Sequence, residues 1–520
     1  MSRTLVSVAV SIVLAACGDR PSTHPARTVD GFYRVTYWTD ATRGTPVADP
    51  AAVALPVSAL VPEPGGYGVL SSTVGLDGSF SIPLVPKESA YYLMLDGRPK
   101  GGNVLIREML TSNPSINKDL VGRSGVAAAT ASTPVTLNVT NLEPWADGVL
   151  EVTSSNAGCW NPLLGDLYGM PTLSAGATST AGQPPFDWSQ ATIFALPDAS
   201  LGDEVWVHQL QHRTVPAGQP GAALGYWAAA NHAKVTSLSI RNGSAATLTA
   251  PLVPSPRTNT VALTIPVSSK WESMRTDMGS PPALGTLIAV VANPYSVAAP
   301  APLQSSVDYS ILSGATLRSG IVNPRLMVIS LRPGALDLAG VPVTYGKFFD
   351  SKYHEAVSVQ FIGQAAITAP GATQSAPFFV NAVRRLPMPA TGPLSVDPII
   401  SPPKDPKVGG VSLFLPLSGV TTTPTFTWSA PTTGTASSYT LQLYKLSVDA
   451  SRATVIQPVP VLWAKVTTPS FQVPAGIVSA GSSYFVTITA AQAPYDQPEF
   501  GSDYAYPWAS ATCISKPFTP

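Results

Sequence analysis

Thr425-Phe426-Thr427-Trp428-Ser429-Ala430-Pro431 is the stretch that decides the fold. Its apolar side chains alternate with Thr and Ser, which is the period of a β-strand with one buried face, and the proline ends the run at a turn. The sequence around it repeats this design in the alternating runs 438–444, 471–474, 478–484 and 486–490. Short strands separated by turns predict a β-sandwich for residues 411–520.

This C-terminal region resembles a fibronectin type III domain. Trp428 occupies the position of the family's core tryptophan, and Val478, Gly481 and Tyr484 have the spacing of its leucine, glycine and tyrosine corner. The chain departs from the family in a longer span between residues 444 and 471. Since the region has no Arg-Gly-Asp tripeptide, the resemblance gives no support to integrin-style binding.

Residues 387–410 precede this region as a proline-rich linker. The prolines are Pro387, Pro389, Pro393, Pro398, Pro402, Pro403 and Pro406. Prolines at this density favour an extended, semi-rigid spacer. We therefore expect a domain boundary here.

The middle region, residues 134–386, contains many alternating runs. They are 135–140, 148–153, 204–208, 235–240, 246–249, 261–267, 286–291, 326–331, 357–362 and 377–383. They predict one or two sandwich domains. No fixed period of about 40–50 residues indicates a propeller.

Two short helices are expected to interrupt these strands. Ser269-Lys270-Trp271-Glu272 forms a capping box that starts a helix, which Gly279 could end. Pro333 stands at a plausible first helical position, and Gly340 could close that helix.

Residues 29–100 also read as strands. Asp77-Gly78 lies between two alternating runs, which is a strong hairpin signal. The series 77–82, 85–86 and 91–93 resembles the carboxypeptidase-regulatory-like or transthyretin-like β-sandwich of bacterial surface proteins. Residues 101–133 then form a connector, in which the apolar run 104–110 fits either a strand or a helical turn.

The N-terminus has the layout of a lipoprotein signal, residues 1–16. Arg3 supplies a positive start, residues 5–14 are an apolar core, and Leu14-Ala15-Ala16-Cys17 resembles the lipobox of bacterial lipoproteins. The core is shorter than the roughly 20 residues that span a bilayer. The resemblance implies cleavage before Cys17 and a lipid on its thiol; the alternative is an ordinary signal peptide with a coincidental cysteine.

Residues 17–28 are small, polar and proline-containing, which predicts a disordered tether. In the enterobacterial sorting pattern, Asp after the lipidated cysteine retains a lipoprotein at the inner membrane. Because Gly18 stands here, the outer membrane is favoured.

Composition bounds the remaining choices. The chain has 520 residues, with 30 basic and 30 acidic side chains, so nothing points to a nucleic-acid partner or a polybasic membrane patch. The 12% charged content is below the usual share of about 25%. The 41 glycines and 53 prolines suit short strands joined by turns.

Two cysteines remain after Cys17: Cys159 and Cys513. An oxidising envelope permits a disulfide between them. The alternative, which we favour, is two buried free thiols.

Candidate catalytic and metal-binding residues are few. Glu204, His208 and His212 would share one face of a helix, but their surroundings read as strand, in which four residues span about 13 Å, too far for two ligands of one zinc ion. His354-Glu355 lacks the second histidine of a zinc-protease helix, because Ser358 stands there. His232 is isolated in sequence.

Serine motifs are equally weak. Ser-x-x-Lys occurs at residues 115–118 and 401–404, as chance predicts, without the Lys-Thr-Gly partner of penicillin-binding enzymes. We expect no catalytic, cofactor-binding or metal-binding residues.

Tryptophans raise the possibility of glycan binding, because flat aromatic faces can stack on sugars. Trp145, Trp160, Trp188 and Trp227 lie beside Gly, Pro or Ala and could be exposed. Packing in the core is the favoured alternative.

Together these features predict an all-β, multidomain string of β-sandwiches. We expect a non-catalytic cell-envelope lipoprotein that serves as scaffold, adhesin or glycan- or protein-binding module. Its partners would be the membrane, through the N-terminal lipid, and an envelope polysaccharide or surface protein. The alternative is a secreted hydrolase with its active site in residues 134–386 and accessory sandwiches around it.

Overall fold

The structure is a computed structural model of the whole chain. It describes residues 25–39, 45, 47–48, 55–87, 90–100, 102–109, 114–165, 170–191, 195–275, 277–278, 284–296, 325–331, 337–349, 353–368, 375–389, 391–448, 456–492 and 508–520. These residues form strands with a few short helical turns, so the predicted all-β fold is confirmed.

The strands form where the sequence alternates. In β10 (Pro134–Thr140) and β28 (Thr425–Ser429), buried and exposed side chains follow one another residue by residue. By contrast, every residue of β11 (Val149–Ser154) and β12 (Cys159–Leu164) is buried. These two strands therefore lie in the interior with both faces covered.

One sheet of 19 strands runs through most of the molecule. Its first half continues from β12 and β11 through β14 (Val205–Thr214), β15 (Gly225–Val235), β20 (Met327–Leu331), β19 (Leu284–Ser296), β22 (Tyr353–Ile367) and β23 (Ala376–Pro387). Its second half adds β33 (Trp508–Ile514), β32 (Ser483–Gln492), β29 (Ser438–Val448), β30 (Ile456–Val466), β8 (Val104–Met109), β7 (Tyr91–Asp96), β3 (Val57–Glu63) and β4 (Gly66–Ser71).

Short strands β17 (Val253–Pro254), β27 (Leu417–Ser418) and β34 (Phe518–Thr519) complete this sheet. Strands from the predicted N-terminal, middle and C-terminal regions are thus hydrogen-bonded side by side. The regions are joined by strand pairing as well as by the chain, which their linear order does not predict.

Four smaller sheets accompany the large one. The first contains β2 (Val47–Ala48), β1 (Ala26–Trp38), β6 (Ser79–Pro86) and β5 (Thr73–Val74), with β9 (Ser115–Val121) parallel to β1. The second contains β13 (Phe186–Asp187), β10 and β16 (Ala246–Pro251), and the third contains β21 (Leu338–Lys347), β18 (Arg257–Ile265) and β24 (Gly392–Ser395). The fourth contains β26 (Val411–Ser412), β25 (Lys404–Val408), β28 and β31 (Ser470–Gln472).

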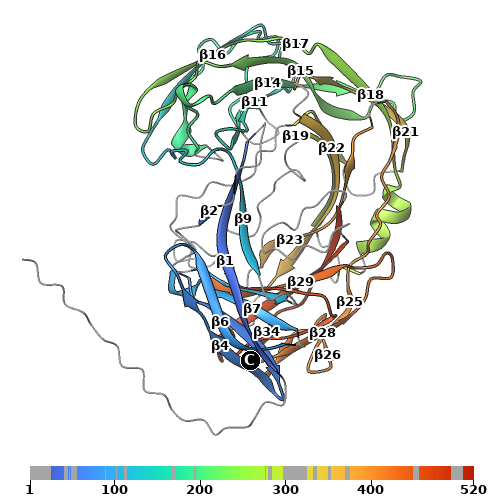
Figure 1. Ribbon diagram of the computed structural model, residues 1–520. Helices are drawn as coiled ribbons and strands as arrows, with labels where there is room; N and C mark the ends of the chain where they lie inside the picture. Colours follow the sequence, from blue (N-terminus) through green and yellow to red (C-terminus); the bar gives the residue numbers. More distant parts are fainter. Residues whose placement is uncertain are drawn as a thin grey trace, which may run out of the picture.

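Three hydrophobic cores lie among these sheets. One core is N-terminal and includes Tyr33 and Tyr91, the second surrounds Trp188, and the third and largest extends from Leu60 to Phe518. In Figure 1, β11 and β14–β17 form an upper lobe, and β4, β6, β7, β25, β26, β28 and β29 lie at the lower end. Strands β1 and β9 run side by side between the two ends.

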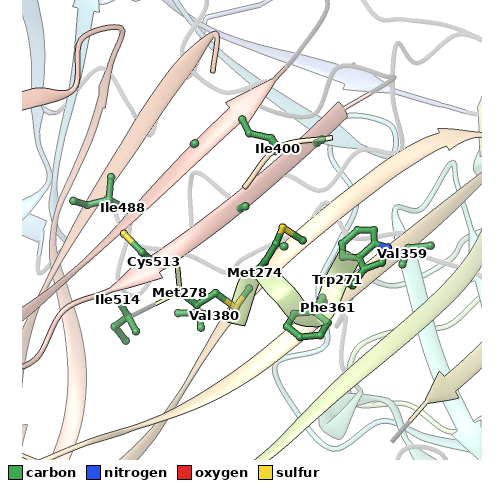
Figure 2. Close-up of a cluster of buried hydrophobic side chains, with 14 of the residues drawn as sticks. Trp271, Met274, Met278, Val359, Phe361, Val380, Ile400, Ile488, Cys513 and Ile514 are labelled. Atoms are coloured by element: carbon green, nitrogen blue, oxygen red, sulfur yellow. The ribbon is translucent and has the colours of Figure 1, made fainter. Parts of the chain in front are cut away.

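A helical segment is present where the first helix is predicted, but it begins at Val267, and its N-cap Pro266 makes no side-chain cap hydrogen bond, so the predicted capping box that starts at Ser269 is wrong. Val267–Trp271 (η5) and Glu272–Arg275 (η6) form a short helical segment, while Gly279 lies outside the described residues. Figure 2 shows its Trp271, Met274 and Met278 within the cluster of buried side chains. The backbone N–H of Ile514 donates to the carbonyl of Met278 at 2.9 Å, which fastens the segment to β33.

The second predicted helix is wrong where it can be seen. Residues 338–340 begin β21, which pairs with β18, and Gly340 has a positive φ of 63°. Residues 333–336 lie outside the described part. Sheet pairing with β18 decides the conformation here, and the proline and glycine signals do not.

The proline-rich segment 387–410 is extended, as predicted, but it is not a free spacer. β24 pairs with β18, and β25 pairs with β26 and β28. Ile400 and Ser401 are buried.

The open choice between a strand and a helical turn for residues 104–110 is also decided: Val104–Met109 is strand β8. The other short turns are η1 (Arg98–Lys100), η3 (Trp188–Gln190) and η4 (Ala199–Leu201).

Candidate functional site

The cysteines have separate places. Cys17, the predicted lipid-attachment residue, lies outside the described residues. Cys159 and Cys513 are both buried and free, and they belong to different hydrophobic cores. Burial raises the pKa of each thiol to about 12. Of the two alternatives, the structure therefore contains two buried free thiols, and the possible disulfide between them is not formed.

Glu204, His208 and His212 do not come together. His208 and His212 lie on β14, as the strand prediction requires, and Glu204 directly precedes it. The Glu204 carboxylate pairs with the Lys234 ammonium at 2.7 Å. The His212 ring packs edge-on against the indole of Trp227, with centroids 5.3 Å apart.

His208 instead pairs with a carboxylate that the sequence did not single out. Its Nε2 lies 3.1 Å from Oε2 of Glu151 on β11, and both side chains are completely buried. The same oxygen accepts hydrogen bonds from the Trp160 indole at 3.2 Å and from the backbone N–H of Arg325 at 3.1 Å. Three segments of the chain thus converge on one buried carboxylate.

Aromatic rings enclose the imidazole side of this pair. His208 and His232 are directly opposite on β14 and β15. Each of their rings lies 5.0 Å from the ring of Phe348, centroid to centroid. Burial, with His208 next to it, holds the pKa of His232 below its usual value of 6.5. A neutral imidazole is therefore favoured in this position.

Charge and aromatic contacts extend the cluster. The guanidinium of Arg325 lies over the Trp160 ring at 5.2 Å, and burial lowers its pKa although Glu151 opposes that shift. We call Glu151, His208, His232, Arg325 and Trp160 the Glu151 cluster. The Glu151 carboxylate and the His208 imidazole are both buried, and the contacts of the cluster join β11, β12 and β14.

The other sequence candidates also have structural partners. Glu355 lies on β22, where its carboxylate accepts from the Tyr345 hydroxyl at 2.8 Å and pairs with Lys347 at 3.0 Å. The Ser401 hydroxyl accepts from the backbone N–H groups of Thr432 and Thr433 at 2.9 and 3.1 Å.

The tryptophans are mostly in the core. Trp145, Trp160 and Trp188 are buried, so the idea that they are exposed for glycan stacking is wrong and core packing holds. Trp227 is half-buried, and its indole donates to the carbonyl of Asp147 at 2.7 Å.

The described residues lack two other kinds of feature. Within them, no group of three or more His, Cys, Asp or Glu side chains could hold a metal ion. In the same part of the chain, no helix has the length and hydropathy needed to cross a membrane.

Comparison with known proteins identifies no family for this chain. No family model matches the chain, and no curated protein matches it. Among solved structures, domains A168-A170 from titin are 8% identical, with coverage of 96% of this chain and 97% of that chain and a TM-score of 0.13. A putative adhesin from Bacteroides ovatus is 9% identical, with coverage of 45% and 76% and a TM-score of 0.11. At these scores neither likeness carries an argument.

Only one faint feature of the sequence points to the Glu151 cluster. Glu151 stands in the run Val149-Leu150-Glu151-Val152-Thr153, where an acid interrupts residues that are otherwise apolar or small. Such an acid in a fully buried strand requires donors, but those donors come from residues 160, 208 and 325, which local patterns do not connect.

Proposed function

We propose that this chain is a non-catalytic, lipid-anchored protein of the bacterial cell envelope that acts as a scaffold, adhesin or binding module. The supporting observation is one of position. Cys17 precedes Ala26, the first residue of β1, by nine positions. Nine extended residues reach at most about 30 Å. A lipid on Cys17 would therefore hold the start of β1 close to a membrane surface.

The direction of β1 supports a role at a distance from that membrane. β1 starts at the lower end of the molecule and runs, with β9, toward the upper lobe (Figure 1). Anchoring at Cys17 would thus leave the lobe of β11, β14 and β15 far from the bilayer. An envelope polysaccharide or a surface protein could reach it there. Gly18 after the cysteine favours the outer membrane.

The continuous sheet supports a scaffold more than a flexible chain of modules. Strand pairs β23–β33 and β30–β8 join the middle, C-terminal and N-terminal regions edge to edge. Backbone hydrogen bonds across these joints resist bending between regions. A rigid body of this length suits a protein that presents a surface at a fixed distance.

The alternative, a secreted hydrolase, would need reactive side chains that a substrate can reach. In the part of the chain that the structure describes, Glu151 and His208 form a carboxylate–imidazole pair 3.1 Å apart, but neither side chain has exposed surface. A catalytic base must come within hydrogen-bond reach of its substrate. We therefore keep the binding role as the proposal.

Labelled palmitate and membrane fractionation test the proposal. The wild-type protein should incorporate palmitate and fractionate with membranes, and Cys17→Ser should do neither. A Cys159→Ser variant is the matched control, because this thiol is buried and free, and it should incorporate palmitate normally. Membrane association of Cys17→Ser without any labelling of the wild type would contradict the anchor. A pull-down with the mature protein against envelope polysaccharides and surface proteins then identifies the partner.

A further inference from the structure

Leu84 on β6 combines two unfavourable features. Its φ is 63°, in the left-handed region, and 69% of the residue is exposed. It lies in a β-bulge: between the register pairs Arg27↔Val85 and Val29↔Ile82, β1 contributes one residue and β6 contributes two. The extra residue of the bulge is presented outward.

Neither feature helps the folded chain in water. Left-handed backbone is disfavoured for residues that carry a Cβ, and glycine is the usual residue at such a bulge position. A leucine that stays exposed gains no hydrophobic stabilisation. A strained residue of this kind motivates a search for a function near it.

The surroundings of Leu84 identify what it could contact. Its strand is paired with the first residues of β1, with Ala26 opposite Pro86. The backbone N–H of Lys87 donates to the carbonyl of Pro25 at 2.9 Å, and the Lys87 side chain is exposed. Leu84 thus lies on the strand that pairs with the first described residues of β1, and Lys87 follows it three residues further along the chain.

We propose that Leu84 and Lys87 contact the surface of the bilayer that holds the Cys17 acyl chains. This inference rests on the proposed function, because the lipid brings this end of the molecule within reach of the membrane. An exposed leucine favours the boundary between headgroups and acyl chains, and a lysine next to it favours anionic headgroups. The contact would orient the molecule, so that the upper lobe points away from the membrane.

A fluorescent label on residue 84 tests the contact. The mature protein with Cys17→Ser is held on vesicles of phosphatidylcholine and phosphatidylglycerol by an N-terminal His-tag and a nickel-chelating lipid. Leu84→Cys carries an environment-sensitive label, and Leu76→Cys is the matched control. Leu76 is 97% exposed at the turn before β6, at the opposite end of that strand. Cys159 and Cys513 are buried and should not take the label.

The label at residue 84 should be quenched by nitroxide-bearing lipids at least about threefold more strongly than the label at residue 76. Equal quenching at the two positions would overturn the proposal. Hydrogen exchange provides a readout without a label: vesicles should slow exchange in residues 79–87 of the unlabelled protein. They should have no such effect in Leu84→Gly, in which glycine suits the bulge and removes the apolar side chain. If vesicles slowed hydrogen exchange in residues 79–87 of Leu84→Gly as much as in the unlabelled protein, the proposal would also be overturned.

The nickel lipid replaces the acyl chains, so this test separates the two proposals. Selective quenching at residue 84 without palmitate on the wild-type protein would leave the membrane contact standing and remove the lipoprotein assignment. Palmitate on Cys17 without selective quenching would leave the lipoprotein assignment standing and remove the membrane contact.

Discussion

Glu151 shows how a single buried residue can hold several strands together. Its carboxylate has no exposed surface and accepts hydrogen bonds from the Trp160 indole and the Arg325 backbone amide, and the His208 Nε2 atom lies 3.1 Å from the same oxygen. Removing an acceptor leaves its buried donors unsatisfied, which costs more than the hydrogen bonds contribute on balance. The Glu151 cluster is therefore the place where one substitution should do most damage.

Glu151→Ala should lower the free energy of unfolding by about 3–5 kcal/mol, because it leaves His208, Trp160 and Arg325 without their shared partner. Urea denaturation followed by tryptophan fluorescence measures this loss. Glu204→Ala is the matched control: it removes a carboxylate that pairs with Lys234 at the surface, where a loss of about 0–1 kcal/mol is expected. Equal losses for the two variants would show that the Glu151 cluster has no special role.

His232 makes stability depend on pH. Burial and the neighbouring His208 hold its pKa in the folded state below 6.5. The unfolded chain then binds the additional proton as the pH falls below about 6.5, so acid favours unfolding by up to about tenfold in the equilibrium constant per pH unit. The stabilisation that the folded state gains from a neutral His232 is complete above about pH 6.5, and it is lost as the pH falls towards the pKa of His232 in the folded state.

His232→Phe should remove this part of the pH dependence between pH 7.5 and 5. Denaturation midpoints at several pH values measure it. His212→Phe provides the control, because His212 packs against Trp227 outside the ring cluster around Phe348, and its variant should keep the wild-type slope. A wild-type slope in His232→Phe would contradict the assignment.

At the scale of elements, the joint between β8 and β30 connects the N-terminal strands β7, β3 and β4 with the rest of the large sheet. The two strands pair in parallel, with Leu462 opposite Val104. Contacts on both sides support them: the Tyr67 hydroxyl donates to the carbonyl of Gln472 at 3.1 Å, and the Glu108 carboxylate accepts from the backbone N–H of Thr467 at 2.7 Å. The N-terminal and C-terminal regions should therefore unfold together.

Ala464→Pro should disrupt this joint. Ala464 is fully buried in β30, which has β29 on one side and β8 on the other, and proline cannot donate to either neighbour. We expect a loss of about 3 kcal/mol or more. Hydrogen exchange should show faster exchange in β7 as well as in β32.

Thr421→Pro, in an exposed loop of the same region, is the control, and it should change the free energy of unfolding by no more than about 0.5 kcal/mol. Faster exchange confined to β32 in Ala464→Pro would mean that the two regions are energetically independent.

Local patterns predict single strands well and their partners poorly. The alternation around Phe426 and Trp428 predicts β28, and that around Val135 predicts β10. The partner of β8 lies more than 350 positions away in β30, and no local signal specifies a parallel pairing at that distance. The glycine signal at Gly340 predicts a helix end, whereas its place in β21 depends on the pairing of that strand with β18, which is remote in sequence.

The same limit applies to the candidate site. Pattern reasoning excludes a helix through His208, since the residues around it alternate as a strand. It cannot find the Glu151 cluster, whose members approach one another only after β11, β12 and β14 have paired. Leu84 is similar, because a left-handed bulge residue leaves no signature in the residue types around it.

At the scale of the whole molecule, the proposed lipid on Cys17 would set the orientation. It would bring the start of β1 to the bilayer, and β1 and β9 connect this end with the upper lobe (Figure 1). The shared sheet keeps the distance between the two ends fixed. The proposed scaffold or binding role follows from this arrangement only if the lipid is present.

Mass spectrometry of the N-terminus of the protein purified from membranes shows directly whether the chain is cleaved before Cys17 and carries a lipid there. The account predicts that Cys17 is the first residue and that its peptide carries the added mass of a diacylglyceryl group. A peptide that continues through residues 14–17 without cleavage, or that begins at an unmodified Cys17, would contradict it.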